Sequence, residues 1–237
     1  NSRIEVLKDY IGEVNPDRVK FLQVQDVENE QEAAEGIMKE LMSYAATFKR
    51  EKVSAKHLIV GMKCGGSDGL SGITANPTVG LFSDMLVSKG GTTILTEVPE
   101  MFGTQKSGSS LVKGVLAYGE RVSDKGLNLL SAPGNDLVAS TACAAAGAQM
   151  VLFTTGRGTP FASPVPTVKI ATNSRLAGNK SNWIDFNAGR IVTDDLPLED
   201  AAKELFQLVL DVASGKKVKA EIAGFHDLAI FKQGVTL

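Results

Sequence analysis

Carboxylate, hydroxyl, thiol and guanidinium groups gather in polar loops that follow apolar runs of this 237-residue chain. An apolar run at residues 58–62 leads into the glycine-rich loop 64–76, and similar polar loops cover residues 97–103 and 154–160. Loops at the carboxyl ends of parallel strands carry the ligand sites of open α/β folds. We therefore expect these three loops to converge on one site.

Asp68, Glu97 and Glu100 supply carboxylates to these loops, and Cys64 adds a thiol at the start of the first one. Carboxylates that end buried strands bind hard divalent cations or act as general acids and bases, and a thiolate is also a metal ligand. We predict Asp68 and Glu97 as catalytic residues and Cys64, Glu97 and Glu100 as metal ligands. Solvated rim charges and a thiol that only packs are the alternatives.

Arg157 lies between Gly156 and Gly158 in the third loop. The planar guanidinium group matches a carboxylate with two parallel hydrogen bonds. We predict that Arg157 grips the carboxylate of an acidic substrate. An ordinary turn is the alternative.

Residues 65–69 read Gly-Gly-Ser-Asp-Gly and match the G-x-S-x-G nucleophile elbow, with Asp185 and His226 following in the order of a hydrolase triad. The elbow requires a helix directly after the serine, and the glycines and proline that follow Ser67 disfavour one. A serine hydrolase that uses Ser67 is therefore a remote alternative.

Composition narrows the choice of partners. The chain has 25 Lys and Arg against 27 Asp and Glu, a net charge of −2, so there is no strong basic field for nucleic acid or an anionic membrane. Its two cysteines form no C-x-x-C motif, and no apolar signal segment opens the sequence, which fits a cytoplasmic protein. Because the chain begins with Asn1 rather than Met, we expect a piece of a longer protein.

Apolar periodicity predicts alternating strands and helices. The expected strands are residues 21–27, 58–62, 92–98, 111–118, 127–132, 150–156, 167–173 and 226–235. The expected helices are residues 30–50, 78–89, 136–147, 174–179 and 198–214. This alternation favours a layered, Rossmann-like α/β fold with a mostly parallel sheet and helices on both faces. We expect an N-terminal segment, residues 1–52, packed on a main catalytic region, residues 53–237.

Four sequence motifs occur in order along the chain: GMKCGGSDGLSGITANP (61–77), TEVPEMFG (96–103), FTTGRGTP (153–160) and WIDFNAG (183–189). They resemble the C-terminal region of the altronate and galactarate dehydratase family. The resemblance spans nearly the whole chain. It implies a hydro-lyase, with D-altronate losing water to give 2-keto-3-deoxy-D-gluconate. Galactarate dehydration and sulfite elimination from sulfolactate, which close relatives perform, are the nearer alternatives.

The resemblance also implies a divalent metal, Fe²⁺ or Mn²⁺. A cation and an arginine on the substrate carboxylate would stabilise the enediolate that forms when the α-proton leaves. A polyol needs many hydrogen-bond partners. The residues expected to bind its hydroxyl groups are Ser67, Thr74, Asn76, Thr155, Asn173 and Asn187.

The sequence departs from the family pattern at two places. Family members carry a small N-terminal module that is not in this sequence. They also carry a long segment after the TEVPEMFG motif, where this chain passes from Gly103 straight to Thr104, Gln105 and Lys106. We expect residues to be missing near 103–106. A sugar-acid-binding module without turnover is therefore a further alternative, and a homo-oligomer is left open.

Overall fold

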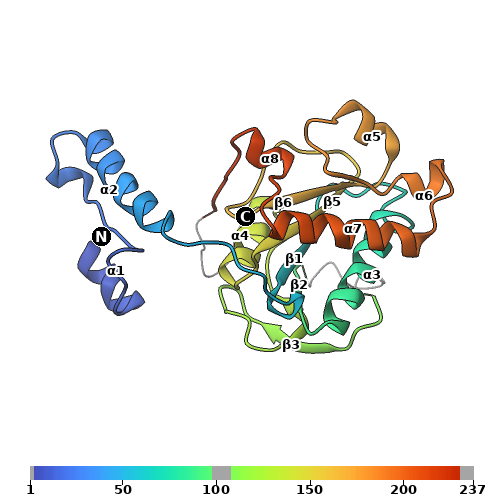
Figure 1. Ribbon diagram of the computed structural model, residues 1–237, viewed down its shortest axis with the longest axis horizontal. Helices are drawn as coiled ribbons and strands as arrows, with labels where there is room; N and C mark the ends of the chain where they lie inside the picture. Colours follow the sequence, from blue (N-terminus) through green and yellow to red (C-terminus); the bar gives the residue numbers. More distant parts are fainter. Residues whose placement is uncertain (1–2, 98–107, 230–237) are drawn as a thin grey trace. The chain divides into compact units, whose positions relative to one another are not determined.

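The computed structural model describes residues 3–97 and 108–229, which belong to two compact units, residues 1–52 and 53–237 (Figure 1). The first unit contains α1 (Ile4–Ile11), the 3₁₀ turn η1 (Val24–Asp26) and α2 (Glu30–Ala45). Asn29 caps α2 as expected, because its side chain accepts a hydrogen bond from the Glu32 amide at 3.2 Å.

Two predictions for the first unit are wrong. The strand expected at residues 21–27 is absent, and η1 is the regular element in that segment. Alternating apolar residues form a stable strand only beside a partner strand, and the described part of this unit supplies none. The second helix ends at Ala45 rather than at residue 50.

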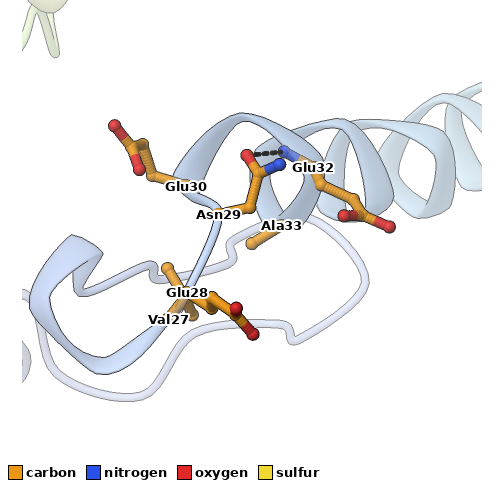
Figure 2. Close-up of a pocket in the computed structure, with 6 residues that line it drawn as sticks. All are labelled: Val27, Glu28, Asn29, Glu30, Glu32 and Ala33. Carbon is orange, nitrogen blue, oxygen red and sulfur yellow. Dashed lines mark hydrogen bonds between the residues drawn. The ribbon is translucent and has the colours of Figure 1, made fainter.

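The first unit has an open, acidic depression of about 710 Å³. Figure 2 shows its lining residues around the start of α2: Val27, Glu28, Asn29, Glu30, Glu32 and Ala33. None of the predicted site residues belongs to this lining. All of the predicted site residues belong to the second unit.

The second unit is built on a seven-stranded sheet in the order β3-β4-β2-β1-β5-β6-β7. Its strands are β1 (Ile59–Cys64), β2 (Thr92–Leu95), β3 (Val112–Leu116), β4 (Gly126–Leu130), β5 (Met150–Thr155), β6 (Thr167–Ala171) and β7 (Phe186–Asn187). Every neighbouring pair is parallel. The predicted α/β fold with a parallel sheet is confirmed.

The helices of this unit are η2 (Ala55–His57, a 3₁₀ turn), α3 (Ala75–Ser88), α4 (Asp136–Ala145), α5 (Ser174–Asn179), α6 (Arg190–Thr193), α7 (Leu198–Ala213) and α8 (Lys219–Ile222). α3 begins three residues earlier than expected. Pro77 is accommodated because it lies in the first turn, where its missing amide is not needed.

Apolar side chains cover both faces of the sheet. On one face, Val60 and Met62 of β1 belong to the cluster that contains α3 and α7, where the Phe82 and Phe206 rings are 5.8 Å apart. Figure 1 shows α7 running across the sheet beside α3. On the other face, α4 approaches β1 so closely that a Cβ atom on Gly61 would lie 2.8 Å from the Cβ of Cys143. The expectation of helices on both faces is therefore confirmed.

Residues 226–229 form no strand, contrary to the expectation for residues 226–235, whose remainder lies outside the described residues. Across the described chain, no helix combines the length and apolar composition that a membrane crossing requires.

Cys64 and Cys143 are both free thiols. Burial, together with the nearby Glu97 carboxylate, raises the pKa of Cys143 to about 12, which fits the predicted packing role.

Candidate functional site

The carboxyl ends of β1 and β5 lie where the strand order of the sheet reverses. β1 pairs with β2 on one side and with β5 on the other, and β5 continues toward β6. Ligands of open parallel sheets bind in the crevice at such a reversal. The structure thus brings together two of the three predicted loops, those after β1 and β5. The third loop follows β2 and is described only through Glu97.

Backbone hydrogen bonds join the loops after β1 and β5. The Gly65 amide donates to the Thr154 carbonyl, and the Gly156 amide donates to the Gly66 carbonyl. The donor–acceptor distance is 2.7 Å in both hydrogen bonds. The fit requires glycine, because a Cβ atom on Gly156 would lie 2.4 Å from Cγ of Asp68. The glycines of the two loops therefore allow a close approach of backbone to backbone.

Two cavities are lined by residues of this loop pair. The first has a volume of about 700 Å³ and is lined by Gly65, Gly66, Gly134, Asn135, Asp136, Leu137, Thr159, Phe161 and Asp227. The second has a volume of about 500 Å³ and is lined by Asp68, Leu70, Gly156, Asn173, Arg175, Leu176 and Asn179. We call them the switch-point cavity and the Asp68 cavity.

Asp68 is held by four hydrogen bonds. Its Oδ1 accepts from the Leu70 amide (3.1 Å) and the Ser71 hydroxyl (3.0 Å), and its Oδ2 accepts from Thr172 Oγ1 (2.8 Å) and Asn173 Nδ2 (2.9 Å). Burial acts to raise the pKa of Asp68, but these hydrogen bonds outweigh it and hold the pKa below its usual value. Asp68 thereby ties the loop after β1 to the end of β6.

Arg157 is exposed, and its aliphatic stem lies against Gly66, where a Cβ atom would be 3.2 Å from the arginine Cδ. The Thr155 hydroxyl accepts from the amides of Arg157 (3.3 Å) and Gly158 (2.9 Å) and fixes the turn. Within the described residues, the guanidinium group has neither a hydrogen-bond partner nor an ion-pair partner. The guanidinium group is therefore available to an anionic ligand, and its contact with a substrate carboxylate stays a prediction.

A buried lysine joins two carboxylates at the ends of β1 and β2. Lys63 Nζ lies 2.9 Å from Glu97 Oε1 and also donates to Asp136 Oδ1 and to the Cys64 carbonyl, the last at 2.6 Å. The side chains of Lys63 and Glu97 are 1% and 5% exposed, whereas that of Asp136 is 43% exposed. The ammonium group thus has three acceptors, and the carboxylate of Asp136 alone reaches the cavity lining. Sequence analysis singled out Glu97 but missed Lys63 and Asp136.

Glu97 has an unusual backbone conformation, with a φ of +65°. Residues other than glycine rarely adopt positive φ, and such strain clusters at functional sites. The Glu97 Oε2 atom accepts a hydrogen bond from the Cys64 amide at 3.3 Å, so its carboxylate spans the ends of β1 and β2. The residue with this conformation is also the one that forms the buried ion pair with Lys63.

Cys64 and Ser67 contact each other, with 3.0 Å between Sγ and Oγ. The hydrolase arrangement is not assembled around Ser67: α3 begins only at Ala75, and Asp185 accepts hydrogen bonds from the amides of Lys169 and Lys219. The described contacts of Ser67 include no histidine. The structure therefore gives no support to Ser67 as a nucleophile.

Three of the predicted polyol-binding side chains are buried and bonded within the protein. Thr74 Oγ1 lies 2.8 Å from the carbonyl oxygens of both Leu70 and Thr172. Asn76 Oδ1 accepts from Thr154 Oγ1 at 3.0 Å, and Thr155 holds the Arg157 turn as described above. These side chains support the loops, and their contact with a substrate stays a prediction.

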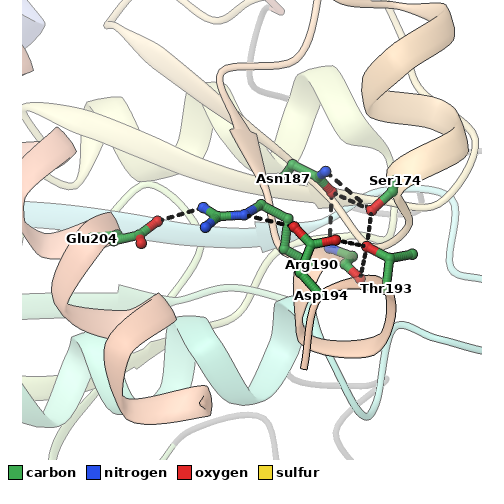
Figure 3. Close-up of polar contacts among 7 residues, drawn as sticks. Ser174, Asn187, Arg190, Thr193, Asp194 and Glu204 are labelled. Atoms are coloured by element: carbon green, nitrogen blue, oxygen red, sulfur yellow. Dashed lines mark hydrogen bonds and ion pairs between the residues drawn. The ribbon is translucent and has the colours of Figure 1, made fainter. Parts of the chain in front are cut away.

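Asn173 and Asn187 follow β6 and β7. Asn173 caps α5 by accepting from the Leu176 amide at 2.8 Å, and it also lines the Asp68 cavity. Asn187 donates to Ser174 Oγ at 3.1 Å, and Figure 3 shows it in a polar network that also contains Arg190. Asn173 is therefore near one of the two cavities, whereas the lining of neither includes Asn187.

Lys169 on β6 is a second buried lysine that sequence analysis missed. Its side chain is fully buried and donates to the Thr159 carbonyl at 2.7 Å. Burial lowers the pKa of Lys169 to about 8, against the opposing effect of the Asp185 and Asp227 carboxylates. The sequence does contain a signal for this residue, namely a lysine inside an apolar strand. Lys63 has the same signal.

Comparison with known proteins identifies the family of the chain. The sequence model of the family described as D-galactarate/Altronate dehydratase, C-terminal, matches residues 55–106 and 103–236. The chain belongs to this dehydratase family. The two matched segments meet at residues 103–106, where the sequence motifs led us to expect missing residues.

Two altronate dehydratases match the whole chain, and a galactarate dehydratase matches part of it. An altronate dehydratase of Bacillus subtilis is 45% identical and one of Escherichia coli is 41% identical, each across 100% of this chain and 60% of the relative. A galactarate dehydratase (L-threo-forming) of E. coli is 34% identical over 77% of this chain and 47% of its own length. The chain thus spans about 60% of the length of the altronate dehydratases it matches.

The divalent cation implied by the dehydratase family is not matched by the side chains at this site. Nowhere in residues 3–97 and 108–229 do three or more His, Cys, Asp or Glu side chains form a group that could hold a metal ion. Glu97 is bonded to Lys63, and Cys64 contacts Ser67. Glu100, the third predicted ligand, lies outside the described residues. A metal site with three such side chains would need at least one from beyond the described part of the chain, so the predicted divalent cation stays a prediction.

Proposed function

We propose that the protein catalyses the dehydration of a sugar acid and that its substrate is D-altronate, which gives 2-keto-3-deoxy-D-gluconate and water. Family membership and the two altronate dehydratase relatives support the reaction class and the substrate. The observation that carries the proposal is the position of Arg157: its aliphatic stem lies against Gly66, which lines the switch-point cavity, and its guanidinium group has no partner within the described residues.

The chemistry requires that a weakly acidic proton leave the carbon next to the carboxylate. Arg157 pairs with that carboxylate and stabilises the negative charge that develops on it. The joined glycine loops place the carboxylate beside the cavity, and the cavity volume of about 700 Å³ is within the range of small-molecule sites. Arg157 therefore both orients the acid and stabilises the enediolate.

Glu97 and Asp68 take different parts in this proposal. Glu97 is too buried to meet the substrate directly, and we assign it the role of holding Lys63 through their 2.9 Å ion pair. Asp68, with its four hydrogen bonds, holds the loop that carries Gly66 and Ser67. We propose separately that the activity depends on Fe²⁺ or Mn²⁺ and that the protein is cytoplasmic.

The deciding experiment is an assay of the full-length protein with D-altronate, galactarate and sulfolactate, each with direct product detection. Every substrate is tested with Fe²⁺, with Mn²⁺ and with a chelator. We expect turnover of D-altronate in preference to the other two acids. Preferred turnover of galactarate or sulfolactate would replace the proposed substrate. No turnover of any acid by the folded, metal-supplied protein would contradict the dehydratase proposal.

A further inference from the structure

The switch-point cavity contains a carboxylate to which the reaction above gives no role. Asp136 is the first residue of α4 and lines the cavity together with Gly65 and Gly66. Asn135 fixes the start of the helix by accepting from the Val138 amide at 3.1 Å. Asp136 therefore has a fixed backbone position in the lining of the cavity. The same lining includes Gly66, against which the stem of Arg157 lies.

One oxygen of Asp136 is held and the other is open. Oδ1 accepts a hydrogen bond from the buried Lys63 ammonium, which Glu97 and the Cys64 carbonyl hold in turn. Within the described residues, Oδ2 has no hydrogen-bond partner, and the side chain is 43% exposed. A carboxylate anchored by one oxygen and open at the other has the arrangement of a positioned general base.

The second acidic side chain of the cavity is arranged differently. Asp227 lies in the C-terminal segment, where its Oδ2 accepts from the Ala162 amide at 3.4 Å and its own amide donates to the Ala162 carbonyl at 2.8 Å. No lysine of the described residues donates to Asp227. Among the cavity-lining carboxylates, the fixed helix position and the buried lysine therefore favour Asp136.

We propose that Asp136 is a catalytic acid–base residue of the dehydration, a proposal that rests on the function proposed above. Its Oδ2 takes the proton from the carbon that bears the substrate carboxylate. The electron pair of that C–H bond is first held in the enediolate that Arg157 stabilises, and it then forms the new carbon–carbon double bond as the neighbouring C–O bond breaks with its electron pair on oxygen. The departing hydroxyl receives the proton back from Asp136 and leaves as water. The resulting enol tautomerises to the keto acid, so the step needs no other reagent.

The test compares Asp136→Asn with Asp200→Asn in the full-length enzyme. Asp200 is a matched control because it also lies in the first turn of a helix and bonds a lysine, with 2.8 Å to Lys203 Nζ, yet it does not line the cavity. For Asp136→Asn we expect kcat to fall by roughly 10²- to 10⁴-fold, and exchange of the substrate α-hydrogen with solvent deuterium to be lost. Asp200→Asn should retain both.

A second variant, Asp136→Glu, keeps the charge that Lys63 requires and moves the carboxylate by one methylene group. We expect it to unfold at the wild-type temperature and to lose at least about tenfold in kcat. Wild-type kcat in either Asp136 variant, or a change in KM alone, would overturn the assignment. An inactive wild-type enzyme would instead refute the proposed function, so the two failures are distinguishable.

Discussion

Lys63 on β1 and Lys169 on β6 lie at the same register on either side of Phe153 on β5. Both lysines are almost fully buried, and each donates to a residue that lines the switch-point cavity, Lys63 to Asp136 and Lys169 to the Thr159 carbonyl. The Lys63 ammonium also lies 5.2 Å from the centre of the Phe153 ring. Two buried lysines on the same face of the sheet, one on each side of β5, therefore hold residues that line the cavity.

The depressed pKa of Lys169 predicts a specific pH dependence of stability. Below about pH 8 the lysine is charged in both states, and its burial opposes folding. Between about pH 8 and 10.5 the folded protein releases the proton while the unfolded chain keeps it, so the free energy of unfolding of the wild type rises relative to that of Lys169→Met. We expect a relative gain on the order of 1 kcal/mol.

Urea unfolding at pH 7 and pH 10 measures this gain for the wild type and for Lys169→Met. Lys216→Met, at an exposed lysine, serves as the control. Parallel pH dependences of the wild type and Lys169→Met would show that Lys169 titrates normally.

Arg157→Ala should reduce kcat/KM of the full-length enzyme by about 100-fold, because loss of a charge-assisted contact costs about 3 kcal/mol. KM should rise and kcat should fall, since the guanidinium binds the substrate carboxylate and stabilises the charge that develops there. Steady-state kinetics checks this, with the exposed Arg121→Ala as control. Unchanged kinetics would remove Arg157 from the site.

Lys63→Met should destabilise the protein by about 3–5 kcal/mol, because it leaves the buried Glu97 carboxylate without its cation. The double variant Lys63→Met/Glu97→Gln should lose less than the sum of the two single variants, since it leaves no uncompensated charge at Glu97. Chemical denaturation of the four proteins gives the coupling energy. The exposed Asp200–Lys203 pair, at 2.8 Å, should yield less than about 1 kcal/mol in the same cycle.

Gly156→Ala should destabilise the loop pair by about 1–3 kcal/mol, because the added methyl group would meet Asp68 at 2.4 Å. Gly69→Ala provides the control, since a Cβ atom there meets nothing within 4 Å. Thermal unfolding measures both variants. Equal melting temperatures would mean that the two loops can separate without cost.

Much of the fold could be predicted because buried parallel strands are short apolar runs. The run at residues 58–62 became β1 (Ile59–Cys64), and the run at residues 92–98 contains β2 (Thr92–Leu95). Residues 21–27 have a strand-like alternation too, but the described part of their unit contains no strand that could pair with them. A local pattern reports the propensity of a segment, whereas a strand also requires a neighbour.

The sequence yielded candidate site residues only where these lie in recognisable loops. Arg157 and Asp68 stand in glycine-rich loops after strands, and the sheet order brings those loops together. The Lys63–Asp136 contact joins residues 73 positions apart and depends on where α4 begins above the sheet. No local spacing encodes such a contact, although a lysine within an apolar strand did signal a buried partner.

The parallel pairing of β1 with β5 also constrains the order of folding. The Ile59 amide donates a hydrogen bond to the side chain of Gln149, 90 residues away in the chain. Parallel pairing at such a separation requires a large loop to close, and the entropy cost of closing it comes before the contacts that offset it. The two glycine loops can meet only after β2, β3, β4 and α4 have emerged from the ribosome. The region around the switch-point cavity therefore forms late in synthesis, and an interrupted chain that ends before residue 150 leaves the side of β1 that pairs with β5 as an exposed, aggregation-prone edge.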